Sequence, residues 1–228
     1  MNIQDNIANE FNEFSKNYTS DMIGCVPYYL DLVSCFTENL PNDFNPQYIL
    51  DLGCGNGNIS GHILQKFPDA IYTLVDASRE MIELCQKKFS NYNVSCIESY
   101  FQNFSFKEAK YDLVVAGFSL HHCNSKEKKE LFKKIFASLK KSGIFACSDL
   151  MISKDNSEHS KLNDRWKSFV HKTFPNGGKW EWLMEHYNEF DKPDDLKDQL
   201  RWLQQIGFRN IDVRVYENYW GHFRAKKI

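Results

Sequence analysis

A glycine-rich turn at residues 53–57 constrains the fold of this chain more than any other feature. The run Tyr48–Leu52 is short, apolar and rich in strand-forming residues, and glycine then recurs at every second position up to Gly57. Apolar residues at helical spacing follow from Ile59, so the turn joins a strand to a helix. Glycines let the backbone turn tightly and let a ligand approach, and a helix start presents unpaired N–H groups to an anion. The sequence therefore predicts a strand–turn–helix unit whose turn holds a ligand.

Strands and helices alternate along the rest of the chain. The predicted strands cover residues 48–52, 71–76, 94–98, 111–116 and 144–148. Apolar stripes predict helices through residues 59–67, 81–89, 131–139 and 196–203. Residues 211–216 and 219–225 are predicted to pair as a hairpin around Glu217-Asn218. Such alternation is typical of a parallel sheet that helices cover on both faces.

Local signals predict where several helices begin and end. Ser78 is placed to cap the helix that follows it, and Asn124 with Glu127 resembles a capping box. Gly143 suits the C′ position after the helix through 131–139.

Two segments lie outside this alternation. Apolar residues at helical spacing, from Ile7 to Tyr18, predict a first helix, and Pro27 is suited to open a second one. Residues 151–192 are rich in aromatic side chains and predict a helical insertion. We expect a single domain over residues 1–228, divided into an N-terminal helical lid (1–42), a binding core (44–150), the insertion (151–192), and a C-terminal helix and hairpin (193–228).

Composition narrows the functional classes. The formal net charge of −2 gives no global field for nucleic acid, and no apolar run approaches the roughly 18 residues of a membrane helix. The seven cysteines are scattered and form no C-x-x-C pair, which argues against a zinc ribbon and fits a reducing compartment. The first residues are acidic and lack the apolar region of a secretory signal. We therefore expect a cytoplasmic protein that binds neither nucleic acid nor membrane.

The glycine spacing distinguishes between two kinds of ligand. A dinucleotide fingerprint needs G-x-G-x-x-G, but Asn58 stands where its third glycine would be. The G-x-G-x-G spacing, with Asp51 two positions before the first glycine, resembles motif I of the class I S-adenosylmethionine-dependent methyltransferases. Phe118-Ser119-Leu120-His121-His122 and Lys140-Lys141-Ser142-Gly143 are similar to later signatures of small-molecule members of that family. The resemblance implies a Rossmann-like, seven-stranded, mostly parallel sheet whose last strand is antiparallel, with S-adenosylmethionine as cofactor.

The resemblance also implies a set of cofactor-binding residues. An acid at the end of the second strand, here Asp76, binds both ribose hydroxyls in the family, and Met81 lies against the adenine. Taken alone, an acid at a strand end is more often a helix cap, but together with the glycine turn the binding role is favoured. The expected cofactor residues are Tyr18, Asp51, Gly53, Gly55, Asp76, Ala77, Met81, Ser99, Tyr100 and Phe118. The chain departs from the family where Glu98-Ser99-Tyr100 replaces the usual adenine-binding Asp or Asn, and where Met22 replaces an arginine.

Methyl transfer depends mainly on aligning the acceptor with the methyl group, and a base is needed only when the acceptor is protonated. His121 follows the fourth strand, where the crevice of an open α/β sheet lies, and we expect a neutral ring that accepts a proton or orients the acceptor.

We expect no metal, because no ligand pair has a typical local spacing. A serine hydrolase elbow is not supported, because His121 stands where G-x-S-x-G requires its last glycine.

These observations predict transfer of a methyl group to a small molecule. Two alternatives stay open: a carboxy-S-adenosylmethionine synthase-like enzyme, which needs an arginine-rich pocket for an added carboxylate, and a non-catalytic cofactor-binding subunit. The sequence leaves open the acceptor, the atom that is methylated and the oligomeric state.

Overall fold

A computed structural model describes residues 17–228, and its centre is a seven-stranded sheet in the order β3-β2-β1-β4-β5-β7-β6. The strands are β1 (Tyr48–Leu52), β2 (Ile71–Asp76), β3 (Val94–Glu98), β4 (Tyr111–Gly117), β5 (Leu139–Leu150), β6 (Phe208–Tyr216) and β7 (Trp220–Lys227). Strands β1 to β5 pair in parallel, and β7 pairs antiparallel with both β5 and β6. The predicted sheet, with its antiparallel last strand, is confirmed.

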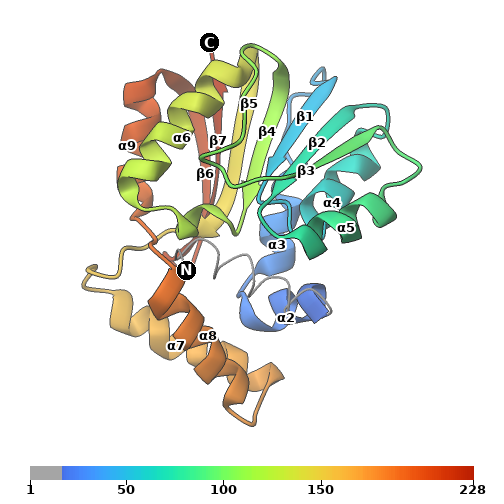
Figure 1. Cartoon of the computed structure of the whole chain (residues 1–228). Helices are drawn as coiled ribbons and strands as arrows, with labels where there is room; N and C mark the ends of the chain where they lie inside the picture. Colours follow the sequence, from blue (N-terminus) through green and yellow to red (C-terminus); the bar gives the residue numbers. More distant parts are fainter. Residues whose placement is uncertain (1–16) are drawn as a thin grey trace.

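Helices cover both faces of this sheet (Figure 1). The described helices are α2 (Tyr18–Cys25), α3 (Tyr29–Ser34), α4 (Asn58–Lys66), α5 (Arg79–Lys88), α6 (Ser125–Ser138), α7 (His159–Thr173), α8 (Gly178–Phe190) and α9 (Leu196–Ile206), with a 3-10 turn η2 at Leu120–His122. Successive side chains of a strand point to opposite faces, so Ile49 packs with α3 and α4 while Leu50 packs with α6 and α9. This is why the central strands are apolar along nearly their whole length.

Most of the predicted helix and hairpin ends are confirmed. The Ser78 hydroxyl accepts a hydrogen bond from the Met81 N–H at 3.2 Å, and Asn124 with Glu127 forms a complete capping box. Glu217 and Asn218 both have positive φ, which a tight hairpin turn requires.

The prediction for Gly143 is wrong. Helix α6 ends at Ser138, and the chain becomes extended at once at Leu139, the first residue of β5. Gly143 therefore lies inside β5, where a Cβ would be 2.9 Å from the carbonyl oxygen of Lys140. Close backbone approach, and not a helix end, explains the glycine.

The N-terminal segment differs in part from the expectation. The predicted helix residues before position 17 lie outside the described part of the chain, and α2 begins at Tyr18. Pro27 does not open the second helix, because α3 starts at Tyr29 after Tyr28, whose φ is +60°. Leu32 on α3 and Phe36 just after it are completely buried and belong to the same core cluster as Ile49 of β1.

The remaining helices form a cover at one end of the sheet. Figure 1 shows α2, α7 and α8 beyond the edge at which β1 runs into the glycine turn. The Trp166 indole N–H donates to the carbonyl oxygen of Cys25 at 2.6 Å, which joins α7 to α2. Gly24 lies so close to Phe174 that a Cβ would be 2.5 Å from its ring. Within residues 17–228, no helix has the length and apolar character to cross a membrane.

Candidate active site

The glycine turn after β1 forms the floor of a cavity, which we call the glycine-loop cavity. Gly53 and Gly55 have φ values of +71° and +51°, a left-handed conformation that other residues adopt at a cost. A Cβ on Gly53 would be 2.3 Å from the Cβ of Ser119. The turn can therefore take this shape only with glycine.

Asp76 fixes the turn from the end of β2. Its Oδ2 accepts a hydrogen bond from the Gly55 N–H at 2.8 Å, and its Oδ1 accepts one from the Ser78 N–H at 2.9 Å. Each carboxylate oxygen has two lone pairs, so both can still accept a ligand hydroxyl. Burial raises the pKa of Asp76, and the hydrogen bonds from the backbone counteract part of this rise.

Nine of the ten predicted cofactor residues line the glycine-loop cavity, which encloses about 850 Å³ and is partly open to solvent. They are Tyr18, Gly53, Gly55, Asp76, Ala77, Met81, Ser99, Tyr100 and Phe118. Phe101, Gln102, His122 and Lys192, which were not predicted, line it too.

Asp51 lies behind the cavity wall and does not line it. The carboxyl group is completely buried, and its Oδ2 accepts a hydrogen bond from the Ser60 hydroxyl at 2.6 Å. Its Oδ1 accepts none from the described residues. Burial raises the pKa of Asp51 to about 7, so the group is poised to ionise when a cation arrives nearby.

A second cavity, which we call the aromatic chamber, lies between the sheet edge and the cover, with a volume of about 690 Å³ that includes space open to solvent. Its walls include Met22, Trp166, Trp182 and Trp220. Tyr18 and Phe118 line both cavities and so form their shared wall. Phe118 has a φ of +54°, a strained conformation of the kind that concentrates at functional sites.

His121 lines the aromatic chamber but not the glycine-loop cavity. Its Nδ1 lies 2.5 Å from Asp149 Oδ1, and its Nε2 lies 3.6 Å from Asp191 Oδ1. Burial alone would lower its pKa, but the charges of Asp149 and then Asp191 outweigh burial and raise the pKa to about 9. The neutral ring expected from the sequence is therefore not favoured at pH 7.

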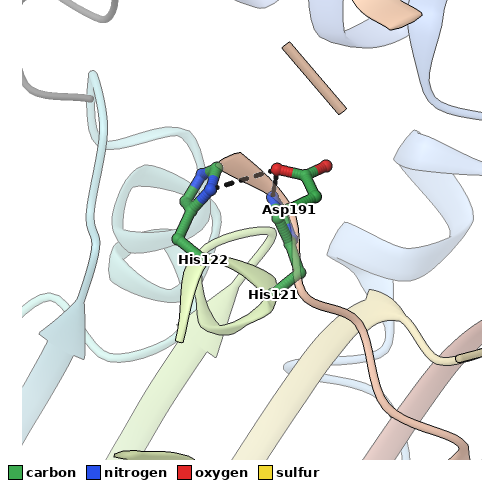
Figure 2. A group of neighbouring side chains, drawn as sticks. All are labelled: His121, His122 and Asp191. Atoms are coloured by element: carbon green, nitrogen blue, oxygen red, sulfur yellow. Dashed lines mark ion pairs between the residues drawn. The ribbon is translucent and has the colours of Figure 1, made fainter. Parts of the chain in front are cut away.

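Three imidazole rings surround one oxygen of Asp191 in this region. Asp191 Oδ1 lies 3.1 Å from His122 Nδ1, 3.6 Å from His121 Nε2 and 3.6 Å from His186 Nε2. Figure 2 shows His121 and His122, which are adjacent in η2, directed towards the Asp191 carboxylate. Asp191 and His186 belong to the insertion and were not predicted.

Comparisons with known proteins find similarity to S-adenosylmethionine-related synthases and methyltransferases. A carboxy-S-adenosyl-L-methionine synthase from Helicobacter pylori is 26% identical over 211 residues, which cover 89% of this chain and 87% of the relative. A malonyl-(acyl-carrier protein) O-methyltransferase from Priestia megaterium is 30% identical over 143 residues, 60% of this chain and 48% of the relative. The human N-acetylserotonin methyltransferase structure has a TM-score of 0.65 at 15% identity, over 96% of this chain and 56% of that one. The chain thus spans about half the length of the latter two proteins.

The family model that matches covers residues 49–143 and is described as a methyltransferase domain. This match and the similar proteins support a class I S-adenosylmethionine-dependent methyltransferase. In this methyltransferase the matched region contains the glycine turn, Asp76 and His121, whereas most of the cover lies outside it.

A short strap at residues 191–195 fixes Asp191 in the methyltransferase. Lys128, on α6, is almost completely buried and donates to Asp194 Oδ2 at 2.6 Å and to the Lys192 carbonyl oxygen at 2.5 Å. The Lys192 N–H donates to the His121 carbonyl oxygen at 2.6 Å. Lys128 thus departs from the solvent-exposed pattern of its neighbours, and no local sequence signal marks it.

Proposed function

We propose that this methyltransferase transfers the methyl group of S-adenosylmethionine, bound in the glycine-loop cavity, to a small acceptor bound in the aromatic chamber. The observation that supports this most directly is the wall shared by the two cavities, made by Tyr18 and Phe118. An in-line displacement needs the acceptor lone pair, the methyl carbon and the sulfur on one line. Two ligands that meet end to end where the cavities adjoin satisfy this requirement when Tyr18 and Phe118 leave a gap through which the acceptor atom reaches the methyl carbon.

The proposed roles follow from the placement of each residue. Asp76 accepts the ribose hydroxyls, and Met81, Ser99 and Tyr100 enclose the adenine. The buried carboxyl of Asp51 ionises and attracts the cationic part of the cofactor through the floor of the cavity. Because its two ring nitrogens face carboxylates, His121 orients the acceptor and does not act as a free base.

The lining of the aromatic chamber indicates the class of acceptor. Its walls are mostly tryptophan, methionine and aliphatic side chains, which favour a largely apolar or aromatic molecule. His121, His186 and Asp191 supply polar groups on its lining, which suits an acceptor with one nucleophilic heteroatom.

The positions of the arginines weigh against carboxy-S-adenosylmethionine synthesis. All six arginines lie in the described part of the chain, and none of them lines either cavity. Arg79 and Arg214 pair instead with Glu83 and Glu38 on the surface. A carboxylate added to the cofactor would lack the bidentate partner that it needs.

We also propose that the protein is cytoplasmic. Its seven cysteines are all free thiols, and six of them are buried, which supports a reducing environment.

Calorimetry and mass spectrometry test these assignments. We expect S-adenosylmethionine and S-adenosylhomocysteine to bind, and a metabolite extract incubated with S-adenosylmethionine to gain one methylated product with release of S-adenosylhomocysteine. A carboxylated cofactor that co-purifies with the protein would favour the synthase instead. Cofactor binding without any product would indicate a non-catalytic subunit, and absence of cofactor binding would contradict the whole assignment.

A further inference from the structure

We propose that His121, His122 and Asp191 bind one divalent metal ion of the zinc class, held between the glycine-loop cavity and the aromatic chamber. The three ligand atoms are His121 Nε2, His122 Nδ1 and Asp191 Oδ1, and they all lie within 4.8 Å of one another. Two imidazoles and a carboxylate are a donor set that proteins use for zinc and for other first-row divalent metals.

The distances between the ligand atoms match a metal centre. Ligands at about 2.0–2.2 Å from a tetrahedral zinc ion lie roughly 3.3–3.6 Å from one another. Asp191 Oδ1 lies 3.1 Å from His122 Nδ1 and 3.6 Å from His121 Nε2 (Figure 2). The two imidazole nitrogens lie within 4.8 Å of each other, so an ion would draw them together by up to about 1.5 Å to complete the coordination.

The second observation is the carboxylate itself. Asp191 is 8% exposed, and nitrogens of three imidazoles lie within 3.6 Å of its Oδ1, with His122 Nδ1 at 3.1 Å. One imidazolium would be enough for an ion pair, so this convergence is better explained by a cation shared among the groups.

A carboxylate outside the cluster orients one ligand. Metal-bound histidines usually donate their other N–H to a carboxylate, which fixes the ring and its tautomer. His121 Nδ1 makes this contact with Asp149 Oδ1 at 2.5 Å, and this leaves Nε2 directed at the cluster. Asp149 is therefore a positioning residue. The contacts of Lys128 with Lys192 and Asp194 likewise fix the backbone next to Asp191.

The place of the ion suggests its task, and this step rests on the proposed methyl transfer. His122 lines the glycine-loop cavity, while His121 and Asp191 line the aromatic chamber. Three protein ligands leave a fourth position open, as in catalytic zinc sites. An oxygen, nitrogen or sulfur atom of the acceptor would take that position and be held near the methyl group.

Metal binding can be tested without an acceptor. After treatment with a chelator and dialysis, the full chain is titrated with Zn²⁺ by calorimetry and with Co²⁺ by visible absorption. We expect one equivalent per chain and the absorption of tetrahedral cobalt. Asp191→Asn and His122→Gln should each weaken binding at least tenfold, and Asp149→Asn by about 10–100-fold. His62→Gln is the matched control, because His62 contacts Thr37, lines neither cavity and should leave binding unchanged.

Several results would overturn the site. These are the absence of stoichiometric binding to the wild type, wild-type affinity in all the cluster variants, or a cobalt–thiolate charge-transfer band, which would place the ion on cysteine. S-adenosylhomocysteine binding is measured on each preparation as well. It shows whether the protein is folded and whether the proposed cofactor site is intact, independently of the metal measurement. A wild type that binds the cofactor but no metal contradicts the metal site alone, and a wild type that binds metal but no cofactor contradicts the cofactor assignment alone.

Discussion

The two cavities are built in different ways from the same chain. Apart from Tyr18 and Lys192, the residues that line the glycine-loop cavity come from residues 53–127, and many directly follow the ends of parallel strands. The aromatic chamber is assembled from α2, η2, α7, α8 and the ends of β5 and β7. The first cavity follows from the sheet itself, whereas the second depends on how the cover docks. Variants that affect one cavity and spare the other therefore test this division.

The largest effect is expected for Gly53→Ala in the glycine-loop cavity. A left-handed φ and a Cβ 2.3 Å from the Ser119 Cβ together should cost the native turn about 3 kcal/mol, so the turn should relax to another shape. Restoring the native shape on binding should then raise the cofactor Kd by up to roughly 10²-fold. Gly178→Ala, at the first turn of α8, is the control because a Cβ there meets nothing within 4 Å. Calorimetry with S-adenosylhomocysteine compares the two variants. Equal affinity in both would show that the turn does not shape the site.

Asp51→Asn should separate stability from binding. The pKa of Asp51 is raised by burial to about 7, so the folded wild type holds a proton that the unfolded chain releases above about pH 4. Wild-type stability therefore falls as the pH rises from 5 to 8, by about 2–3 kcal/mol from this group, and the variant should lack this loss. Urea unfolding at the two pH values measures the difference. At pH 8 the variant should also bind the cofactor more weakly, and tighter binding would contradict the proposed role of the charge.

Asp76→Ala removes the acceptor of two backbone N–H groups and, as proposed, of two ribose hydroxyls. Hydrogen bonds to a charged group contribute about 1.5–3 kcal/mol, so the cofactor Kd should rise at least tenfold. Asp76→Asn keeps one acceptor oxygen and should lie between the wild type and Asp76→Ala. Calorimetry on the three proteins checks this order, and an unchanged Kd in Asp76→Ala would remove the residue from the site.

The same division explains what the sequence could predict. Residues that line the glycine-loop cavity, such as Gly53 and Asp76, lie within a few positions of predicted strand ends, and parallel strands bring those ends to one edge. Asp51 has the right motif position, but it lies within β1, so its side chain is buried next to Ser60 and not in the cavity. The prediction for Gly143 failed because the sequence does not distinguish a glycine that caps a helix from one that allows two backbone segments to approach closely.

The cluster of His121, His122 and Asp191 could not be predicted from local sequence patterns. Asp191 follows His122 by 69 positions in the sequence, and its approach depends on the path of the insertion and on the strap that Lys128 holds. A buried lysine within a run of exposed ones has no sequence signature. Sequence spacing identifies a pair of zinc ligands only when both ligands lie in the same helix, strand or turn.

The smallest effect is expected in the aromatic chamber, for Trp182→Leu. The indole stacks on His186 with ring centroids 5.9 Å apart, and Lys179 Nζ lies 4.9 Å from its ring centroid. Loss of one aromatic contact costs about 0.5–1.5 kcal/mol, so the acceptor KM should rise about 2–10-fold. Trp182→Phe keeps an aromatic face and should recover most of this loss.

The cofactor Kd should not change, because Trp182 lines the chamber and not the glycine-loop cavity. Steady-state kinetics with the acceptor found by mass spectrometry, together with cofactor calorimetry, gives both numbers. Equal changes in KM and in the cofactor Kd would mean that the cover closes over both ligands as one unit, and the division between the cavities would then fail.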